Sequence, residues 1–280
     1  MTNLYLCSFA SPDLKNSVKR LVNQVNEINL YKNFKVFSWN DLSFDKKKQI
    51  KIFIKKNNKR LFGYACWKPE IILKYLEEIP ENSILQYSDI GCHLNKNGYS
   101  RLKEYIQITN QNNILAFQYK KPDFKIDIDL KYQIYFESEY TKGDLFNHFK
   151  LNNNSPLKKS EQVWSGTMFF KNNSVSKFFL KKWLEICKSN NLIDDSPSIE
   201  KNSKEFVEHR HDQSVFSILC KLNKVTFLSA SECEWAEDKN GRYWEHLKDY
   251  PILAKRDKKL NLYKRFISRQ GKNIRRMFNK

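Results

Sequence analysis

Two short segments of the sequence concentrate side chains that can bind phosphate, hold a cation or move a proton. In the first, Asp89 follows the hydrophobic run SILQYS and is itself followed closely by Gly91. If that run is a strand of a parallel sheet, Asp89 lies at the carboxyl edge, where open α/β sheets bind ligands. Its carboxylate suits Mg²⁺ or Mn²⁺, and Gly91 lets a ligand approach the main chain. An ordinary strand end followed by a turn glycine explains the same residues.

The second segment, EHRHDQ at 208–213, places two imidazoles, a guanidinium, a carboxylate and an amide at the predicted start of a helix. A helix N-terminus attracts anions, an arginine can meet a phosphate, and His and Asp can bind a metal or carry protons. A solvated loop before a capped helix is the alternative interpretation.

Two further segments add candidate residues. The run VWSGT contains Trp164, which suits either stacking on a sugar or core packing, and Gly166, which indicates close approach of a ligand or another backbone. Lys68 stands at a predicted helix N-terminus, where the helix dipole disfavours a cation. That position suits phosphate binding, although a surface lysine with a partly buried stem is equally compatible with it.

The elements that must position these residues alternate along the first 90 residues as β-α-β-α-α-β. The hydrophobic patterns predict strands at 3–9, 34–38 and 83–88, and helices at 12–31, 43–56 and 67–80, the last bracketed by Pro69 and Pro80. This alternation predicts a Rossmann-like α/β fold, with a mixed, mainly parallel sheet flanked by helices.

The rest of the chain continues the alternation without an internal repeat. We expect a loop at 152–160 and a polar, mobile segment at 191–206. Asp212 is the expected N-cap of the last helix, and Thr141 or Asp144 lies near the start of an earlier one. The expected apolar side of the helix at 174–190 comprises Phe178, Leu180, Trp183, Leu184 and Cys187. The remaining predicted elements are helices at 99–110, 141–152, 174–190 and 211–222, and strands at 113–119, 163–170 (broken by Gly166) and 224–230.

Composition limits the class of protein. With 40% hydrophobic and 14% aromatic residues in 280, the chain can build the core of one large domain. Six cysteines without a CxxC pair indicate reduced thiols of a cytosolic protein rather than a zinc site. No apolar run approaches the roughly 18 residues of a membrane span, and the start does not read as a secretory signal, so we expect a cytoplasmic location.

Four segments, taken in order, resemble a family of bacterial and viral glycosyltransferases of the GT-A type that act in surface polysaccharide, capsule or lipopolysaccharide synthesis. The matching segments are GYACWKPEIILKYL, YSDIGC, VWSGTMFF and EHRHDQSVFSIL, and the opening FASPDLKNSVKRL and the late WEHLKDYPILAKRDKK also fit. The resemblance spans about residues 4–257. It implies transfer of a hexose from a nucleotide sugar, with UDP as the expected nucleotide, to a glycan or lipid-linked acceptor.

The resemblance also implies roles for individual residues. Asp89 matches the first Asp of a DxD motif whose second Asp is replaced by Gly91, so the implied Mn²⁺ or Mg²⁺ has one ligand fewer and either another residue completes its shell or metal dependence is weak. Asp212 either takes the acceptor proton, in an inverting enzyme, or positions substrate, in a retaining one, with Gln213 beside the sugar. The implied donor-binding residues are Phe9, Ala10, Ser11, Lys68, Ser88, Asp89, Gly91, His209 and Arg210. The implied acceptor-binding residues are Trp164, Ser165 and Gly166. The candidate metal ligands are Asp89, His211 and His246.

The C-terminal end differs from the rest of the chain in its charge. Of the total net charge of +19, residues 255–280 carry eleven Lys or Arg against one acid. We therefore divide the chain into a catalytic domain at 1–257 and a basic amphipathic helical tail at 258–280. Such a tail suits an anionic membrane surface, which would place the protein on the cytoplasmic face, but a helix packed on the body or a solvated tail fits as well.

Two other functions fit part of the sequence. The high pI and the interleaved aromatic residues permit a nucleic-acid-binding protein, although no nucleic-acid-binding motif is visible and we expect no nucleic acid partner. A metal-dependent phosphoesterase could use Asp89, His209, His211 and Asp212. The four ordered segments favour the transferase.

Overall fold

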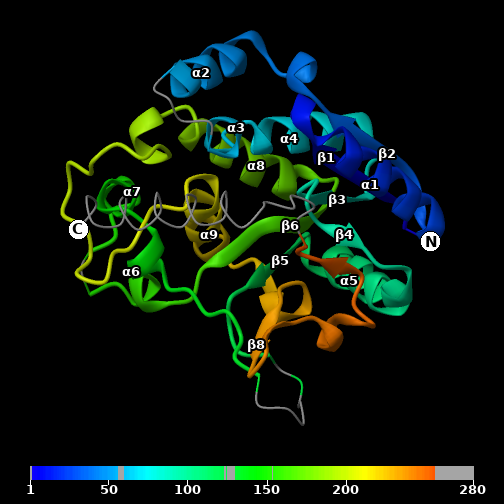
Figure 1. Ribbon diagram of the computed structural model, residues 1–280. Helices are drawn as coiled ribbons and strands as arrows, with labels where there is room; N and C mark the ends of the chain where they lie inside the picture. Colours follow the sequence, from blue (N-terminus) through cyan, green and yellow to red (C-terminus); the bar gives the residue numbers. More distant parts are fainter. Residues whose placement is uncertain (1, 56–59, 123, 125–129, 153, 256–280) are drawn as a thin grey trace.

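A six-stranded mixed sheet forms the centre of the molecule, with the strand order β2-β1-β3-β6-β5-β7 (Figure 1). The computed structural model describes residues 2–55, 60–122, 124, 130–152 and 154–255, so the predicted tail at 258–280 lies outside the described residues. The strands of the sheet are β1 (Leu4–Phe9), β2 (Tyr31–Phe37), β3 (Ile84–Ser88), β5 (Ile114–Gln118), β6 (Val163–Lys171) and β7 (Thr226–Ser229).

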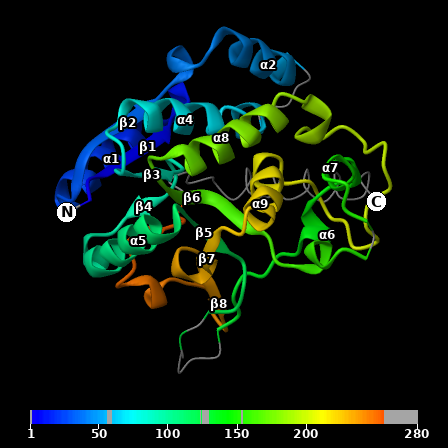
Figure 2. The ribbon, with the colours of Figure 1, turned by 180° about the vertical axis from the view of Figure 1, so that it is seen from behind.

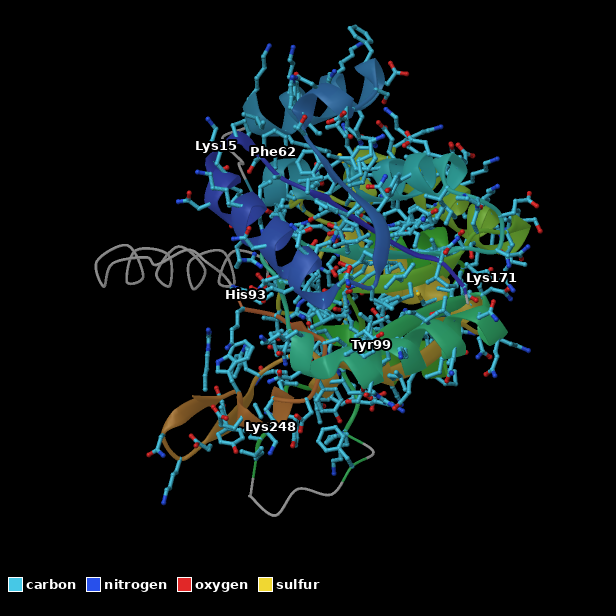
Figure 3. The ribbon with its side chains drawn as sticks, turned by 90° about the vertical axis from the view of Figure 1, so that its right-hand side faces the viewer. Lys15, Phe62, His93, Tyr99, Lys171 and Lys248 are labelled. Carbon is cyan, nitrogen blue, oxygen red and sulfur yellow. The ribbon has the colours of Figure 1, made fainter. Side chains whose placement is uncertain are left out.

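All neighbouring strands of this sheet run parallel except β6, which is inserted antiparallel between β3 and β5. The start of β6 therefore lies beside the carboxyl ends of its parallel neighbours. In Figure 3, Lys15 and His93, which follow β1 and β3, lie on the left, whereas Lys171 at the end of β6 lies on the opposite side. The predicted mixed, mainly parallel α/β sheet is confirmed.

Helices cover both faces of the sheet, α4 and α8 on one side and α5 on the other (Figures 1 and 2). Each face has its own apolar core, because alternate residues of a strand point to opposite sides. Along β1, Tyr5 and Cys7 join the core under α4, α8 and α9, while Leu4 and Leu6 join the core under α1 and α5. The helices are α1 (Lys15–Ile28), α2 (Phe44–Lys55), α3 (Leu61–Tyr64), α4 (Lys68–Glu78), α5 (Tyr99–Asn112), α6 (Glu137–Tyr140), α7 (Gly143–His148), α8 (Ser174–Ile186) and α9 (Asp212–Leu222).

Two small antiparallel ribbons complete the described chain: β4 (His93–Leu94) with β10 (Ile252–Leu253), and β8 (Ala236–Asp238) with β9 (Gly241–Tyr243). All six cysteines are buried and free, as expected for reduced thiols. None of the described helices is long and apolar enough to span a membrane. Short 3-10 helices occupy Pro12–Leu14, Trp39–Asp41, Lys96–Gly98, Pro156–Lys159, Asn190–Leu192, Ala230–Glu232 and Glu245–Leu247.

Several local predictions need correction. The helix expected at 141–152 is shorter in the structure, where α7 covers Gly143–His148 with Asp144 in its first turn, and the separate short helix α6 precedes it. The segment at 191–206 is partly anchored, since Leu192 and Phe206 are buried. On α8 the predicted apolar residue Phe178 is 56% exposed, and its neighbour Phe179 is buried instead. The helical period alone does not distinguish two adjacent aromatic residues, which is why the prediction chose the wrong one.

The strand β6 is continuous and not broken at Gly166. However, its register with β5 shifts between Leu115 and Phe117, whereas its pairing with β3 stays regular. The missing side chain at Gly166 makes room for the strand's own Trp164, since a Cβ there would lie 2.1 Å from the indole ring. The glycine is thus explained by packing within the strand.

Gly98 fixes the C-terminal segment of the described chain against the start of α5. A Cβ at this position would lie 2.1 Å from the main-chain nitrogen of Pro251 and 2.3 Å from the main-chain carbon of Tyr250. Main-chain atoms cannot move aside as the end of a flexible side chain can. This contact holds β10 beside β4.

We expect Gly98→Ala to lower the free energy of unfolding by about 1–3 kcal/mol, because the added methyl group overpacks this contact. Ser100→Ala, at an exposed position near the start of the same helix, is the control and should change stability little. Urea unfolding of both variants gives the measurement. Equal stability of the two variants would contradict the tight packing of Gly98.

Candidate active site at the carboxyl edge of the sheet

A buried lysine joins three parts of the chain at the carboxyl edge of the parallel strands. The Nζ of Lys68, at the first position of α4, lies 2.9 Å from Oδ2 of Asp212 and 3.3 Å from Oδ1 of Asp89. It also donates to the carbonyl of Ser165 at 2.9 Å, and the Ser165 hydroxyl donates to Asp212 at 3.1 Å. The sequence therefore placed Lys68 correctly at a helix start but did not identify its partners, which come from the residue after β3, from β6 and from α9.

A left-handed turn aims Lys68 into this site. Consecutive residues from Leu61 to Ala65 have positive φ, between 48° and 84°, although only Gly63 is a glycine. Such a conformation costs about 1–2 kcal/mol for each residue that carries a Cβ. Aromatic packing holds the turn in place: the ring of Phe62 lies 5.7 Å from that of Phe9, and Tyr64 lies 4.9 Å from Phe53.

Asp89 is held rigidly but faces outward, with its side chain 46% exposed. Its main-chain N–H donates to the carbonyl of Gly166 at 2.8 Å, and the Tyr87 hydroxyl donates to its Oδ1 at 2.6 Å. Arg20 of α1 donates to the carbonyls of Ile90 and Cys92, which fixes the turn after Asp89. A fixed, accessible carboxylate at a sheet edge is well placed to contact a substrate.

Asp212 begins α9 and is almost fully buried, with 2% of its surface exposed. The N-cap is His211 rather than Asp212, and its φ of 54° with ψ of −122° is a strained conformation for a residue with a side chain. The ring of His211 donates from Nδ1 to the carbonyl of Ile193 at 2.8 Å and lies 4.5 Å from the ring of Tyr64. The carboxylate of Asp212 binds Lys68 and Ser165 instead of capping its helix.

His209 serves the same segment as a structural residue. Its Nε2 donates to the carbonyl of Leu192 at 2.9 Å, and its Nδ1 accepts from the N–H of Lys142 at 3.4 Å. Burial lowers the pKa of His209 well below its ordinary value, and the neighbouring His211 lowers it further. The ring is therefore neutral at pH 7, and both of its nitrogens are engaged.

Burial and charge act in opposite directions on the central pair. Burial would lower the pKa of Lys68, but the carboxylates of Asp212 and Asp89 outweigh it and raise that pKa above its ordinary value. Burial raises the pKa of Asp212, assisted by the charge of Asp89 and opposed by Lys68. A carboxyl whose pKa is raised by folding favours the folded state most at low pH, and this contribution is lost as the pH rises through the raised value.

No family model matches the chain, and no curated protein matches it in sequence. Among solved structures, it is similar to a glycosyltransferase involved in glycosylation of the major capsid of PBCV-1, with 10% identity, a TM-score of 0.47, and coverage of 94% of this chain and 98% of the other. It is also similar to the galactosyltransferase LgtC solved with donor and acceptor sugar analogues, with 11% identity, a TM-score of 0.43, and coverage of 82% of this chain and 75% of the other. Mouse xyloside xylosyltransferase 1 is similar with 9% identity, a TM-score of 0.42, and coverage of 83% of this chain and 87% of the other. At this level of similarity the chemistry must be read from the site itself.

The predicted site residues fall into three groups: those that meet at Lys68, those that follow strands at the same sheet edge, and those that pack against neighbouring side chains. Asp89, Ser165 and Asp212 contact Lys68, and Gln213 reaches the same place by accepting from the Ser165 N–H at 3.5 Å. Gly91, Ala10 and Ser11 follow β3 and β1 at the same edge. Phe9 stacks on Trp67 at 3.9 Å, Ser88 bonds to Gln86 and Thr167, and Trp164 lies over Gly166. Binding roles for these residues stay predictions.

The expected metal ligands Asp89, His211 and His246 do not come together. No three His, Cys, Asp or Glu side chains within the described residues are grouped to hold a metal ion. His211 bonds to Ile193, and His246 bonds to the carbonyl of Glu234 at 3.1 Å. Oδ1 of Asp89 already faces the ammonium of Lys68, and Gly91 stands where a second carboxylate is expected. This donor set does not fit the predicted divalent cation.

Sequence reasoning missed several residues that shape the site. Tyr87 was recognisable, because it lies near the end of β3 and two residues before Asp89, the spacing that puts side chains of an extended chain on the same face. Gln162 and Arg20 carried no comparable signal, since their partners lie far away in the chain. Gln213 donates to Gln162 at 2.9 Å, which extends the site toward β5.

We expect the buried pair to show strong energetic coupling. Lys68→Met should lower the free energy of unfolding by about 3 kcal/mol or more, because it leaves the Asp212 carboxylate buried without a counter-charge. The double variant Lys68→Met, Asp212→Asn should recover much of that loss, which gives a coupling above about 1 kcal/mol in a double-mutant cycle measured by urea unfolding.

The exposed pair of Lys35 and Glu78, whose charged atoms lie 2.7 Å apart, is the matched control. Its cycle, with Lys35→Met and Glu78→Gln, should give less than about 1 kcal/mol because solvent screens the pair. Coupling no larger at Lys68 than at Lys35 would refute the central role of the buried pair.

The pKa of Asp212 should respond to its neighbour Asp89. Because the charge of Asp89 raises it, Asp89→Asn should move the pKa of Asp212 down toward the ordinary aspartate value. Carboxyl ¹³C NMR titration of the wild type and the variant measures the shift. Exposed Asp13→Asn is the control and should leave the Asp212 titration in place. An upward movement in Asp89→Asn would contradict the arrangement.

Proposed function

We propose that the chain is a glycosyltransferase that moves a sugar from a nucleotide-sugar donor to a glycan or lipid-linked acceptor. One observation carries the proposal: a buried ammonium, an exposed carboxylate and a buried carboxylate meet within 3.3 Å at the carboxyl edge of an α/β sheet. Transfer from a nucleotide sugar requires stabilisation of a departing diphosphate and orientation of an acceptor hydroxyl. A fixed cation beside carboxylates supplies both kinds of group.

Lys68 is the proposed group that stabilises the diphosphate. Of its contacts with carboxylates, the one to half-exposed Asp89 at 3.3 Å is longer than the one to Asp212 at 2.9 Å. A phosphate oxygen can therefore take the place of Asp89 beside the ammonium without disturbing the buried pair. Asp89 is then free to accept a hydrogen bond from a sugar hydroxyl. The low dielectric around Lys68 strengthens its attraction for the leaving group.

Asp212 is the proposed positioning residue for Lys68. Its carboxylate is buried and engaged by both Lys68 and the Ser165 hydroxyl. This arrangement supports a role of Asp212 in orienting Lys68 and the substrate, as expected for a retaining enzyme. It supports less a role as the base that takes the proton of the acceptor hydroxyl. Gln213, one residue further along α9, is the proposed contact to the transferred sugar.

We propose that dependence on Mn²⁺ or Mg²⁺ is weak. The ammonium of Lys68 stands beside Asp89, where the resemblance implies a divalent cation, and the donor set around Asp89 does not fit one. The same geometry speaks against a phosphoesterase with a metal held by Asp89, His209, His211 and Asp212. UDP is the proposed nucleotide, and surface polysaccharide synthesis the proposed setting. Cytoplasmic location and membrane contact through 258–280 belong to the same proposal.

The proposal is tested by thermal shift with UDP, GDP and their sugar conjugates, each with Mn²⁺ and with EDTA. A donor at about 100 times its dissociation constant stabilises the folded protein by roughly 2.7 kcal/mol. We expect a selective shift that EDTA leaves largely intact. Transfer of radiolabelled sugar should fall by about a hundredfold or more in Asp212→Asn and in Asp89→Asn, and stay near wild type in Lys35→Met. Folded protein that shifts with no nucleotide sugar would reject the proposal.

A further inference from the structure

The guanidinium of Arg210 lies in a cage of three tyrosine rings. Its central carbon is 3.9 Å from the ring centre of Tyr135, 4.0 Å from that of Tyr140 and 5.8 Å from that of Tyr119. The faces of these rings attract a cation, and they partly offset the loss of water around it. The cage holds a positive charge in a half-buried place two residues before Asp212.

Among the described residues, this guanidinium has hydrogen-bond donors but no acceptor for them. A guanidinium carries five N–H groups, and within the described part of the chain none of those of Arg210 forms a hydrogen bond or ion pair. Two acids lie in its neighbourhood and are engaged elsewhere. Glu208 is bound to Arg60 at 3.2 Å, and Glu234 accepts from the Tyr119 hydroxyl at 3.4 Å. Arginines that are held away from water usually meet a carboxylate or a phosphate.

The cage is built rigidly and is joined to the candidate active site. The N–H of Arg210 donates to the carbonyl of Tyr140 at 3.1 Å, and the N–H of Tyr119 donates to the carbonyl of Gln162 at 2.9 Å. The rings of Tyr135 and Tyr140 also meet edge to face at 5.1 Å. Gln162 in turn accepts a hydrogen bond from Gln213, so the cage and the Lys68 site share a hydrogen-bonded wall.

The position of the cage separates it from the proposed donor site. Tyr119 follows β5 and Asp89 follows β3, with β6 between them, which corresponds to roughly 10 Å across the sheet edge at the usual strand spacing. The expected donor segment after β1 lies on the other side of β3. A group bound by Arg210 is therefore near enough to belong to the other substrate and lies away from the diphosphate at Lys68.

We propose that Arg210 and its tyrosine cage form a subsite for an acidic group, a carboxylate or a phosphate, on the acceptor, so that the acceptor is an anionic glycan. The planar guanidinium matches both groups with two parallel hydrogen bonds. This inference rests on the proposed function, because it assigns the second substrate of the same site. It also moves Arg210 from the donor side, where the resemblance puts it, to the acceptor side.

The diphosphate of the donor offers the same chemistry, so the test must separate the two sources. The full chain is titrated, with saturation-transfer NMR, with methyl glucuronide and glucose 6-phosphate as acidic probes, and with methyl glucoside as the neutral match. Pyrophosphate, followed by calorimetry, represents the donor. The variants are Arg210→Gln, Arg210→Lys and the control Arg242→Gln, an exposed arginine 4.4 Å from the ring of Trp235.

We expect the wild type to bind at least one acidic probe about tenfold or more tightly than methyl glucoside. Arg210→Gln should lose this preference, Arg210→Lys should reduce it because it lacks the planar fork, and Arg242→Gln should keep it. Pyrophosphate affinity should not change in Arg210→Gln. If that variant does not fold, the reduced preference of Arg210→Lys is the deciding result.

Three results would overturn the inference: equal binding of acidic and neutral probes by the wild type, an unchanged preference in the Arg210 variants, or weakened pyrophosphate binding in Arg210→Gln with glucuronide binding intact. The last result would assign the cage to the donor. None of these readouts needs sugar transfer. Failure of the nucleotide-sugar panel therefore rejects the proposed function, and failure of the acidic-probe series rejects the anionic acceptor.

Discussion

The ion pair between Lys68 and Asp212 is the interaction on which the candidate site depends. Taking both charges out of water is unfavourable, and the pair is tolerated only because further polar atoms complete its environment. The carbonyl and hydroxyl of Ser165 do so from β6, and Asp89 does so from the solvent side. The first residues of α4 and α9 are thereby locked onto one antiparallel strand. Two helices that are distant in the sequence therefore begin at the same point of the sheet edge.

Backbone strain occurs beside both members of that pair. The left-handed turn at 61–65 precedes Lys68, and His211, in a strained conformation, precedes Asp212. The two strained segments touch, because the ring of Tyr64 lies 4.5 Å from that of His211. Strain of this kind persists only where surrounding packing determines it, and it concentrates at functional sites. Here aromatic packing and a hydrogen bond to the main chain hold the geometry that aims the two charges.

The site contains two cations in contrasting environments. Lys68 is surrounded by acceptors, whereas Arg210 is surrounded by tyrosine faces. The wall between them runs through Ser165, Gln213 and Gln162. In the proposed site, a phosphate can replace one of the two carboxylates beside Lys68. The donors of Arg210, which lies among tyrosine rings, can bind an acidic group. In the two-substrate reaction that we propose, this contrast assigns different ligands to the two ends of one sheet edge.

The sequence by itself determined the elements and the edge at which the chemistry gathers, because hydrophobic periodicity and strand-end polar residues are local signals. All six strands of the central sheet and the helices α1, α2, α4, α5, α8 and α9 could be predicted, as could Lys68, Asp89 and Asp212 as candidate residues. Only the tertiary structure decided their partners, since the antiparallel insertion of β6 brings Ser165 to Lys68. In the tertiary structure Trp164 packs over Gly166, and His211 and His246 lie apart from Asp89. The direction of each side chain is set by packing against segments distant in the sequence, which no local pattern encodes.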